Sequence, residues 1–505
     1  MEILDPVAPK KEYFSTSKSW KSTVLRVFGP LGTSDLRALG LMRIGISLVL
    51  LLDICIRLGD LEAHYTNLGV LPLTALFEYA WHPYHFSIYT GASSFPWMVF
   101  LFVLNMGCVL CLMVGYRTRL FTFLCWVFLL SLHNRNPLVH QGGDDLLRLI
   151  LFWSLFLPWG YCYSMDARNS RTKPKYKLTG YRSFAYFGYI LQIFYVYFFS
   201  ALHKTSPEWT TDFTALYYAL SLDQILMPFG KLIYPFEGFL KVLTVATYYT
   251  EMLLPFVLLI PFFTGGWRLL FIIVIGMLHL GIALSLNVGL FPLISTMAMI
   301  ALLPSFVMNK FDLIVQKISS RYLPSVRNAP IKQQRHTKPE EKPTMAILAI
   351  FFIVYTFSWN LRTVNVPLGE YGMQWIGHTL RIDQFWSMFA PAVFKDDGWF
   401  IVEATTKNGD KIDLLDQGNP LSFDRPVHIA STYKNDRWRK YSENILFIYN
   451  SHYRGYYCNY LMRKWNTTHD NRVNHVEIIY MKTPTLPNYE EDGPFVERLC
   501  SCSLD

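Results

Sequence analysis

The sequence predicts an all-α polytopic membrane bundle of about nine transmembrane helices that ends in a small extracytoplasmic α+β domain. Three observations predict this fold class. The 505 residues are 52% hydrophobic and only 16% charged, whereas soluble domains carry roughly 25% charged residues. The apolar residues gather in long runs, while the last part of the chain alternates apolar and polar residues. This composition excludes a disordered chain and disfavours an ordinary cytosolic enzyme.

Nine apolar runs are candidates for membrane-spanning helices, because crossing a bilayer takes roughly 17–25 apolar residues. One such run is usually a buried core helix, but nine in succession with aromatic residues at their ends favour a membrane bundle. The third and fourth runs are short, so we expect one of them to tilt little or to re-enter the membrane partly. The nine runs cover residues 39–58, 96–114, 119–133, 146–160, 184–202, 241–263, 267–286, 288–304 and 345–361.

The positive charges orient these runs. Lys and Arg concentrate in the N-terminal tail and in the loops at 161–183 and 305–344, while residues 59–95 contain none. Cytoplasmic loops carry such an excess, so we expect the N-terminus inside and the C-terminal part outside. The net charge of +9 then belongs to inner segments and does not indicate nucleic-acid binding. The expected divisions are a cytoplasmic basic tail at 1–38, an eight-span membrane domain at 39–304, a cytoplasmic basic loop at 305–344, a ninth transmembrane helix at 345–361 and an extracytoplasmic domain at 362–505.

After the last apolar run, the sequence changes from long apolar stretches to alternating apolar and polar residues. Residues 399–406 and 411–415 alternate like strands around Asn408-Gly409-Asp410, which is a hairpin signal. Residues 434–466 read as helical, and residues 473–481 read as a further strand. Together they predict one small α+β domain.

Three cysteines fall in this outer domain, where disulfides persist. A bridge from Cys458 to Cys500 or Cys502 is expected, which leaves one thiol free. No metal site is expected, because no second Cys or His cluster stands at ligand spacing. The segment at 380–391 is amphipathic, and an interfacial helix on the bilayer is favoured over an element that grips substrate.

Ionisable side chains inside the runs are costly, so each one needs an explanation. Arg43 and Arg57 lie near opposite ends of the first run, where their side chains can snorkel. Asp53 precedes Arg57 by one helical turn, so an ion pair explains both residues. We assign these three residues to structure.

The loop between the third and fourth runs gathers polar residues at the predicted outer mouth of the bundle. One of its carboxylates is explained as the cap of the following helix. Capping does not explain the whole set, which we therefore regard as candidate functional residues. The set consists of His133, His140, Asp144, Asp145 and Arg148.

Lys204 follows the fifth run and lies at the same outer level. A lysine at the end of a span is commonly a snorkelling anchor. Enclosure by aromatic residues such as Trp209 would instead favour its neutral form and let it act as a general base. Glu251 and His279 lie roughly halfway across the sixth and seventh runs, where they need partners and are expected to serve each other. A proton path, a substrate contact and an internal hydrogen bond are all open for this pair.

At these residues the sequence resembles a known family. The loop Asn134-Arg-Asn-Pro-Leu and the motif Tyr197-Phe-Phe-Ser-Ala-Leu-His-Lys204, followed by Trp209, are similar to the HTTM (horizontally transferred transmembrane) domain. That domain occurs in vitamin K-dependent gamma-carboxylases and their bacterial relatives, and the likeness covers roughly residues 34–304. The stretch at 380–391 and Arg437-Trp-Arg-Lys-Tyr look similar to tails of bacterial members.

The resemblance implies a membrane enzyme in which Lys204 deprotonates reduced vitamin K or a related quinol. With oxygen this gives a strong base that takes the γ-proton of a glutamate in a secreted or membrane peptide, and carbon dioxide traps the carbanion. The implied catalytic residues are Lys204, His203 and Asp144. The implied substrate- or quinone-binding residues are His133, His140, Asp145, Arg148, Trp209, Glu251 and His279.

The chain departs from the animal enzymes at two places. Gly143 or Asp144 stands where those enzymes have a functional histidine, and His140 is displaced by a few residues. A disulfide between the first outer loop and the outer domain is impossible, because residues 59–95 contain no Cys. The resemblance to bacterial members implies the bacterial cytoplasmic membrane, or the endoplasmic reticulum membrane in a eukaryotic host.

Two other functions remain open. The protein is then either a quinone-binding membrane factor that matures a secreted peptide by different chemistry, or a non-enzymatic membrane assembly protein. A transporter is disfavoured, because the runs show no internal repeat and no matched pair of broken helices. The expected partners are the lipid bilayer, a quinone and a Glu-containing secreted peptide, with no nucleic acid and no metal.

Overall fold

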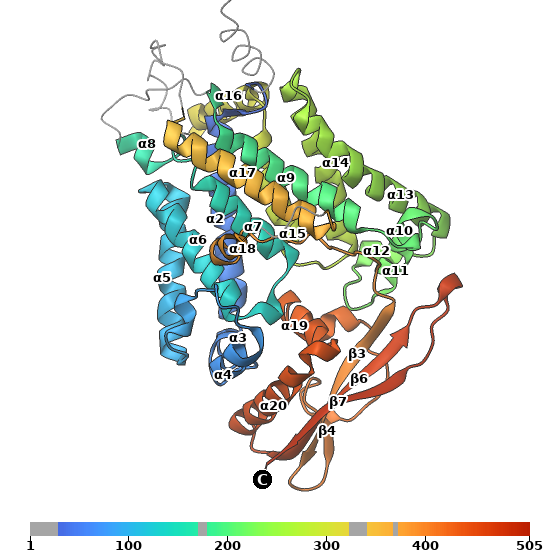
Figure 1. The fold of residues 1–505 in the computed structure, drawn as a ribbon. Helices are drawn as coiled ribbons and strands as arrows, with labels where there is room; N and C mark the ends of the chain where they lie inside the picture. Colours follow the sequence, from blue (N-terminus) through green and yellow to red (C-terminus); the bar gives the residue numbers. More distant parts are fainter. Residues whose placement is uncertain (1–28, 170–178, 323–340, 367–371, 505) are drawn as a thin grey trace, which may run out of the picture.

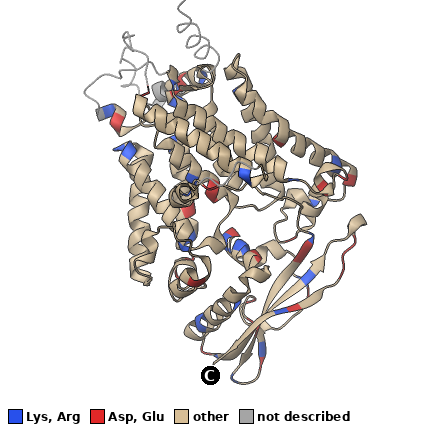
Figure 2. Cartoon of the chain, in the orientation of Figure 1, with Lys and Arg blue, Asp and Glu red and all other residues tan. Residues whose placement is uncertain are grey.

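The structure, a computed structural model, describes residues 29–169, 179–322, 341–366 and 372–504. A large helical bundle lies at one end and a β-sheet domain at the other (Figure 1). The long helices of the bundle carry few charged residues (Figure 2). Most of the predicted basic tail lies outside the described residues, as do residues 323–340 of the loop at 305–344.

Six helices are long and apolar enough to cross a membrane, and a bent pair of helices is a seventh candidate. The expected count of nine is therefore not confirmed in the described part of the chain. The bent pair, α15 (Phe291–Met299) with its continuation to Leu302 and α16 (Ser305–Tyr322), turns by 100°. The six are α2 (Leu36–Leu58), α5 (Phe95–Val114), α9 (Phe184–His203), α13 with its 3₁₀ continuation (Glu237–Leu259), α14 (Thr264–Ser285) and α17 (Pro343–Thr363).

The two short runs account for most of the difference. They form α6 (Thr118–Arg135) and α7 (Gly142–Ser154). The 13 residues of α7 extend only about 20 Å, whereas the hydrocarbon core of a bilayer is about 30 Å thick. Every residue of α7 from Leu146 to Ser154 is buried, and the helix packs against α6, α9 and α15. It is a core helix of the bundle.

Arg43 does not snorkel. Its side chain is fully buried and donates to the carbonyl oxygens of Leu112 and Met113, each at 2.5 Å, and of Tyr163 at 2.5 Å. The last carbonyls of a helix lack partners within the helix. Arg43 therefore closes the C-terminal end of α5 from inside the bundle.

The shorter elements connect these helices. They are β1 (Thr33–Asp35), α3 (Leu61–Tyr65), α4 (Leu73–Ala75), η1 (Leu76–Ala80), η2 (Ile88–Thr90), η3 (Pro137–Val139), α8 (Met165–Asn169), β2 (Thr179–Arg182), α10 (Pro207–Thr210), α11 (Ala215–Ser221), α12 (Pro228–Ile233) and α18 (Gln374–Leu380). Strands β1 and β2 pair antiparallel, and β1 contacts α2 and α9.

The C-terminal region is the predicted α+β domain. Its five antiparallel strands are ordered β5-β4-β3-β6-β7, and the predicted β3–β4 hairpin is confirmed. Helices α19 (Asp436–Leu446) and α20 (Arg454–Thr468) contribute to an apolar core with the sheet. The strands are β3 (Asp396–Thr406), β4 (Lys411–Asp413), β5 (Asn419–Pro420), β6 (Val473–Pro484) and β7 (Phe495–Ser503).

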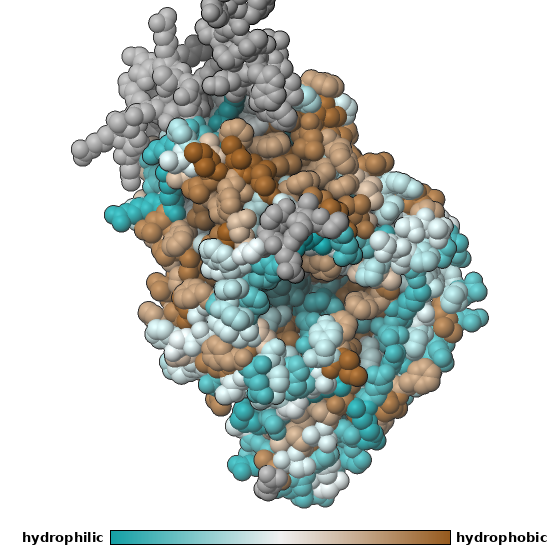
Figure 3. Space-filling model, viewed as in Figure 1, coloured by the Kyte–Doolittle hydropathy of each residue, from teal (hydrophilic) through white to brown (hydrophobic). Residues whose placement is uncertain are grey.

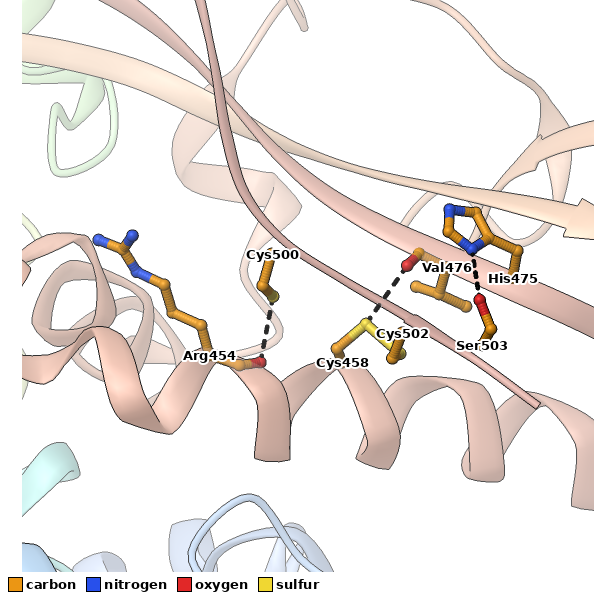
Figure 4. Close-up of a disulfide and its surroundings, with 7 residues drawn as sticks. All are labelled: Arg454, Cys458, His475, Val476, Cys500, Cys502 and Ser503. Atoms are coloured by element: carbon orange, nitrogen blue, oxygen red, sulfur yellow. Dashed lines mark hydrogen bonds between the residues drawn. A yellow bond between two sulfur atoms is a disulfide. The ribbon is translucent and has the colours of Figure 1, made fainter. Parts of the chain in front are cut away.

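A disulfide ties this domain together. Cys458 on α20 bonds to Cys502 on β7, which confirms the expected bridge to the C-terminal pair (Figure 4). Cys500 is the free thiol, and its Sγ contacts the carbonyl oxygen of Arg454 at 3.3 Å. The bond joins the edge strand to the helix beneath it.

Residues 381–391 are not an interfacial helix. After α18 the chain runs extended, with Ile382, Gln384 and Trp386 buried and Phe385 exposed. This alternation has the period of two that belongs to extended backbone. Gln384 also exchanges hydrogen bonds with Gln192 of α9. The bundle thus satisfies a polar residue that would otherwise be buried alone.

Candidate functional site

A cavity of about 990 Å³ lies where the bundle meets the C-terminal domain. Its walls come from α9, α13 and α14, the start of α7, the segment at 385–390, and α19 and the sheet of the C-terminal domain. Figure 3 shows a hollow between the apolar helical part and the polar C-terminal part. The size is that of a pocket for a small organic ligand.

Lys204 lines this cavity at the end of α9. Its side chain is only 3% exposed, so the ammonium group does not reach the surface as a snorkelling anchor would. Nζ donates to the Glu251 carboxylate and to Oγ of Ser200, the latter at 3.1 Å. Nζ also lies 4.8 Å from the centre of the Trp209 ring. The Lys204 amine is therefore enclosed beside the cavity by a carboxylate, a hydroxyl group and the face of an aromatic ring.

Glu251 and His279 do not serve each other. Glu251 on α13 pairs with Lys204, whereas Nε2 of His279 on α14 lies 2.8 Å from the hydroxyl of Tyr197. Both residues line the cavity. Nδ1 of His279 is buried and has no hydrogen-bond partner among the described residues. A bound ligand is the natural partner for such an atom.

Trp209 and His203 differ in position. Trp209 lines the cavity, and its indole Nε1 donates to the carbonyl oxygen of Phe389 at 2.9 Å. His203 instead places Nε2 3.0 Å from Oγ1 of Thr363 on α17 and packs against Phe385. It does not line the cavity. The structure thus separates His203 from the Lys204 amine.

Asp145 and His140 line the cavity at the start of α7. Oδ1 of Asp145 lies 2.9 Å from Nε2 of His140 and accepts from Nη2 of Arg148 at 2.6 Å. Burial raises the pKa of Asp145, but the positive charges of His140 and Arg148 outweigh it and lower the pKa to about 2. Arg148 itself is fully buried, and its Nε donates to the carbonyl oxygen of Arg381 at 2.5 Å. Arg148 therefore holds the segment that leads into the cavity wall.

Asp144 belongs to a separate group, which we call the buried charge cluster: Asp53, Arg57, Asp144 and Arg437. Arg57 donates to Asp53 at 2.8 Å and to Asp144 at 3.0 Å, which confirms the expected Asp53–Arg57 pair. Arg437, from α19 of the C-terminal domain, donates to Asp53 at 2.7 Å and to both oxygens of Asp144. Two acids and two bases balance each other, and Arg57 is buried here and does not snorkel.

This cluster also completes the cap of α7. The carboxylate of Asp144 accepts from the backbone N–H of Gln141 at 2.9 Å, as expected for a capping residue. Burial raises the pKa of Asp144, but Arg437 and Arg57 hold it well below its ordinary value. Nε2 of His133 lies 3.6 Å from Asp144. Neither Asp144 nor His133 lines the cavity, so the structure assigns both to the joint between the bundle and the C-terminal domain.

Sequence reasoning does not single out Tyr197 and Ser200. Together with Lys204 they follow one another at three and four residues, which places all three on one face of α9. That spacing is the signal by which they are found. Arg437 gives no such signal, because its partners lie on α2 and α7, far away in the sequence.

A family comparison covers the helices that carry this site. A family model for the HTTM domain matches residues 32–307, which is more than half of the chain and includes Lys204, Glu251 and His279. No curated protein and no solved structure matches the chain. The apolar helices and the matched domain are those of a multi-pass membrane protein. The chain therefore belongs to the HTTM domain family, as the resemblance implies.

Proposed function

We propose that this protein is an integral membrane enzyme of gamma-carboxylase type, which couples quinol oxygenation to carboxylation of glutamate in a secreted or membrane peptide. One observation carries the proposal. Within an HTTM domain, Lys204 is buried against a cavity of about 990 Å³ and is held there by Glu251, Ser200 and Trp209. A confined amine beside a ligand-sized space is what a general base requires.

Lys204 acts as the base in this proposal. An amine must be neutral before it can take a proton, and the carboxylate of Glu251 is in contact with Nζ. Glu251 is therefore the group that receives the lysine proton before the quinol O–H gives up its own. Ser200 accepts one N–H of the amine at 3.1 Å and fixes its direction. The Trp209 ring limits water on the remaining side.

A reduced quinol fits the residues of the cavity. The walls offer aromatic and aliphatic side chains, among them Phe291, Phe389 and Met388. The buried Nδ1 of His279 offers a hydrogen-bonding atom without a partner among the described residues. When bound, the quinol with oxygen supplies the strong base that removes the γ-proton of glutamate, so that the carbanion can add to carbon dioxide.

The peptide would meet the site from the C-terminal domain. Arg439, Lys440 and Tyr480 of that domain line the same cavity as Lys204. The Cys458–Cys502 disulfide is typical of an oxidising compartment. We therefore propose that the protein lies in the bacterial cytoplasmic membrane, with residues 362–505 on its extracytoplasmic side. Secreted peptides are exposed on that side.

One observation favours the non-enzymatic alternative. Lys204 and Glu251 satisfy each other's charge, and a buried ion pair can serve bundle assembly alone. Lipid extraction of the purified protein separates the two functions. A co-purified quinone that is lost on Lys204→Ala supports the enzyme, whereas no bound quinone supports the assembly protein.

The activity itself is tested with reduced quinol, a Glu-rich peptide and labelled bicarbonate. Loss of a general base costs roughly 10²–10⁴-fold in rate, so Lys204→Ala should reduce label incorporation by that factor. Lys241→Ala is the matched control, because Lys241 lies on α13, is exposed, pairs with Glu237 and does not line the cavity. Absence of label, or the same label in Lys204→Ala as in the control, would contradict the proposal.

A further inference from the structure

Three histidine side chains converge at a place outside the cavity. His82 and His85 lie in the loop between η1 and η2, and His378 lies in α18. One ring nitrogen of each lies within 4.8 Å of one from each of the others. The ring centres of His82 and His378 are 4.2 Å apart, and those of His82 and His85 are 5.1 Å apart.

The local backbone brings the first two rings together. The N–H of His85 donates to the carbonyl oxygen of His82 at 2.8 Å, so the sequence His82-Pro-Tyr-His85 closes one turn. The N–H of Tyr84 lies 3.3 Å from Nδ1 of His82. Ligation by His82 would replace this long contact. All three histidines are half-buried, which leaves one side open to solvent.

The surroundings resemble those of a metal site. Nδ1 of His378 lies 3.9 Å from the carboxylate of Asp383, and such outer carboxylates orient metal-bound histidines. Arg381 and Arg362 are nearby cations, and the charge of Arg381 is offset by Asp383 at 3.2 Å. The ring of Trp359 packs edge-on against His378 and holds its plane.

We propose that His82, His85 and His378 bind a divalent transition metal ion, with Zn²⁺ as the best match. Three imidazoles and one water complete the tetrahedral sphere that Zn²⁺ prefers. Such an ion would link the first outer loop to α18, from which the chain runs into the cavity wall at 385–390. This proposal departs from the expectation of no metal site. His378 is distant in the sequence from His82 and His85, so the three residues come together only in the folded chain.

A second group of possible ligands, His133, His140 and Asp144, is a weaker candidate. Asp144 already accepts hydrogen bonds from Arg57 and Arg437. Two guanidinium groups in contact with a ligand oppose a further cation. We therefore assign the metal to the three-histidine site alone.

The test uses the full chain in detergent, purified with a tag that contains no histidine and stripped with a chelator. We expect titration with ZnCl₂ to give one tightly bound ion per chain, and CoCl₂ to give the visible absorption of a tetrahedral site. His378→Ala and His85→Ala should each weaken Zn²⁺ binding more than about 100-fold, beyond the 10–100-fold that loss of an outer partner costs. His428→Ala, which removes an exposed histidine of the C-terminal domain, should leave binding unchanged.

The melting temperature distinguishes lost binding from lost folding. Without metal, the variants should melt like the wild type, and only the wild type and His428→Ala should gain stability on addition of Zn²⁺. The proposal is wrong if the wild type binds no more Zn²⁺ than the double variant His82→Ala/His378→Ala. It is equally wrong if His140→Ala removes the ion. Neither result bears on the carboxylase proposal, because none of these readouts requires the quinol.

Discussion

Two regions of the molecule bury acids against bases, and they differ in what surrounds the charges. In the buried charge cluster, both oxygens of Asp144 accept from arginine, and none of the four residues lines the cavity beside Lys204. Beside the cavity, Lys204 and Glu251 pair with each other but keep one side toward a space of about 990 Å³. Both regions bury charged side chains, but only the Lys204–Glu251 pair has a side that a ligand in the cavity can reach.

The choice of base follows the same division. Arginine presents a rigid fork of donors and stays charged, which suits the fixed joint made by Arg57 and Arg437. Lysine carries one amine that can lose its proton, which suits a site that moves protons. The comparison therefore supports the proposal that Asp144 serves assembly and Lys204 serves chemistry, although the family resemblance implies a catalytic role for both.

The largest effect on stability is expected at the cluster. Arg437→Ala leaves Asp53 and Asp144 short of a buried partner, which costs roughly 3–5 kcal/mol in the free energy of unfolding. Denaturation in detergent micelles measures this. Arg463→Ala, at an exposed arginine of α20, is the control and should change little. A loss below about 1 kcal/mol for Arg437→Ala would contradict the claim that the buried charge cluster stabilises the joint between the bundle and the C-terminal domain.

The next effect is expected beside the cavity. Glu251→Gln keeps the size of the side chain but removes the group that receives the lysine proton. Label incorporation should fall by about 10²-fold, the lower range for loss of a proton-transfer group. Glu237→Gln is the matched control, because this exposed glutamate on α13 pairs with Lys241 and does not line the cavity. Full activity of Glu251→Gln would show that Lys204 gives its proton elsewhere.

A third carboxylate, Asp397 on β3, sharpens the comparison through pH. Burial, with the nearby charge of Asp223, raises its pKa to about 7, opposite to the shift at Asp144. The unfolded value is about 3.9, so between pH 4 and 7 the folded state binds the extra proton and loses stability as the pH rises. Asp397→Asn should therefore gain stability relative to wild type across this window, on the order of 4 kcal/mol by pH 8.

The measurement is the free energy of unfolding of both proteins between pH 4 and 8. The matched control is Asp396→Asn, since Asp396 is the exposed neighbour on the same strand. The difference from wild type should change more strongly with pH for Asp397→Asn than for this control. A constant difference for Asp397→Asn would show that Asp397 is already ionised in the folded protein at pH 4.

Local patterns in the sequence predict much of this structure. The alternation around Asn408-Gly409-Asp410 predicts the β3–β4 hairpin, and cysteine placement predicts the bridge to Cys458. Of the residues predicted for the site, six line one cavity. They are His140, Asp145, Lys204, Trp209, Glu251 and His279.

The remainder depends on partners that are distant in the sequence. Length and apolarity alone do not distinguish α7, a buried core helix, from a membrane span. The segment at 380–391 has an apolar face as a helix would, but Gln192 and Arg148 hold it extended. His203 is the last residue of α9 and directly precedes Lys204, yet its side chain contacts Thr363 of the neighbouring α17 and does not enter the cavity.

Label incorporation by Lys204→Arg tests the central claim most directly. Arginine keeps the positive charge beside Glu251 but stays protonated, so it preserves an anchor or an assembly pair and removes a base. We predict the same melting temperature as wild type and label incorporation reduced at least about 100-fold. Wild-type incorporation by Lys204→Arg would contradict the account and leave Lys204 a structural residue.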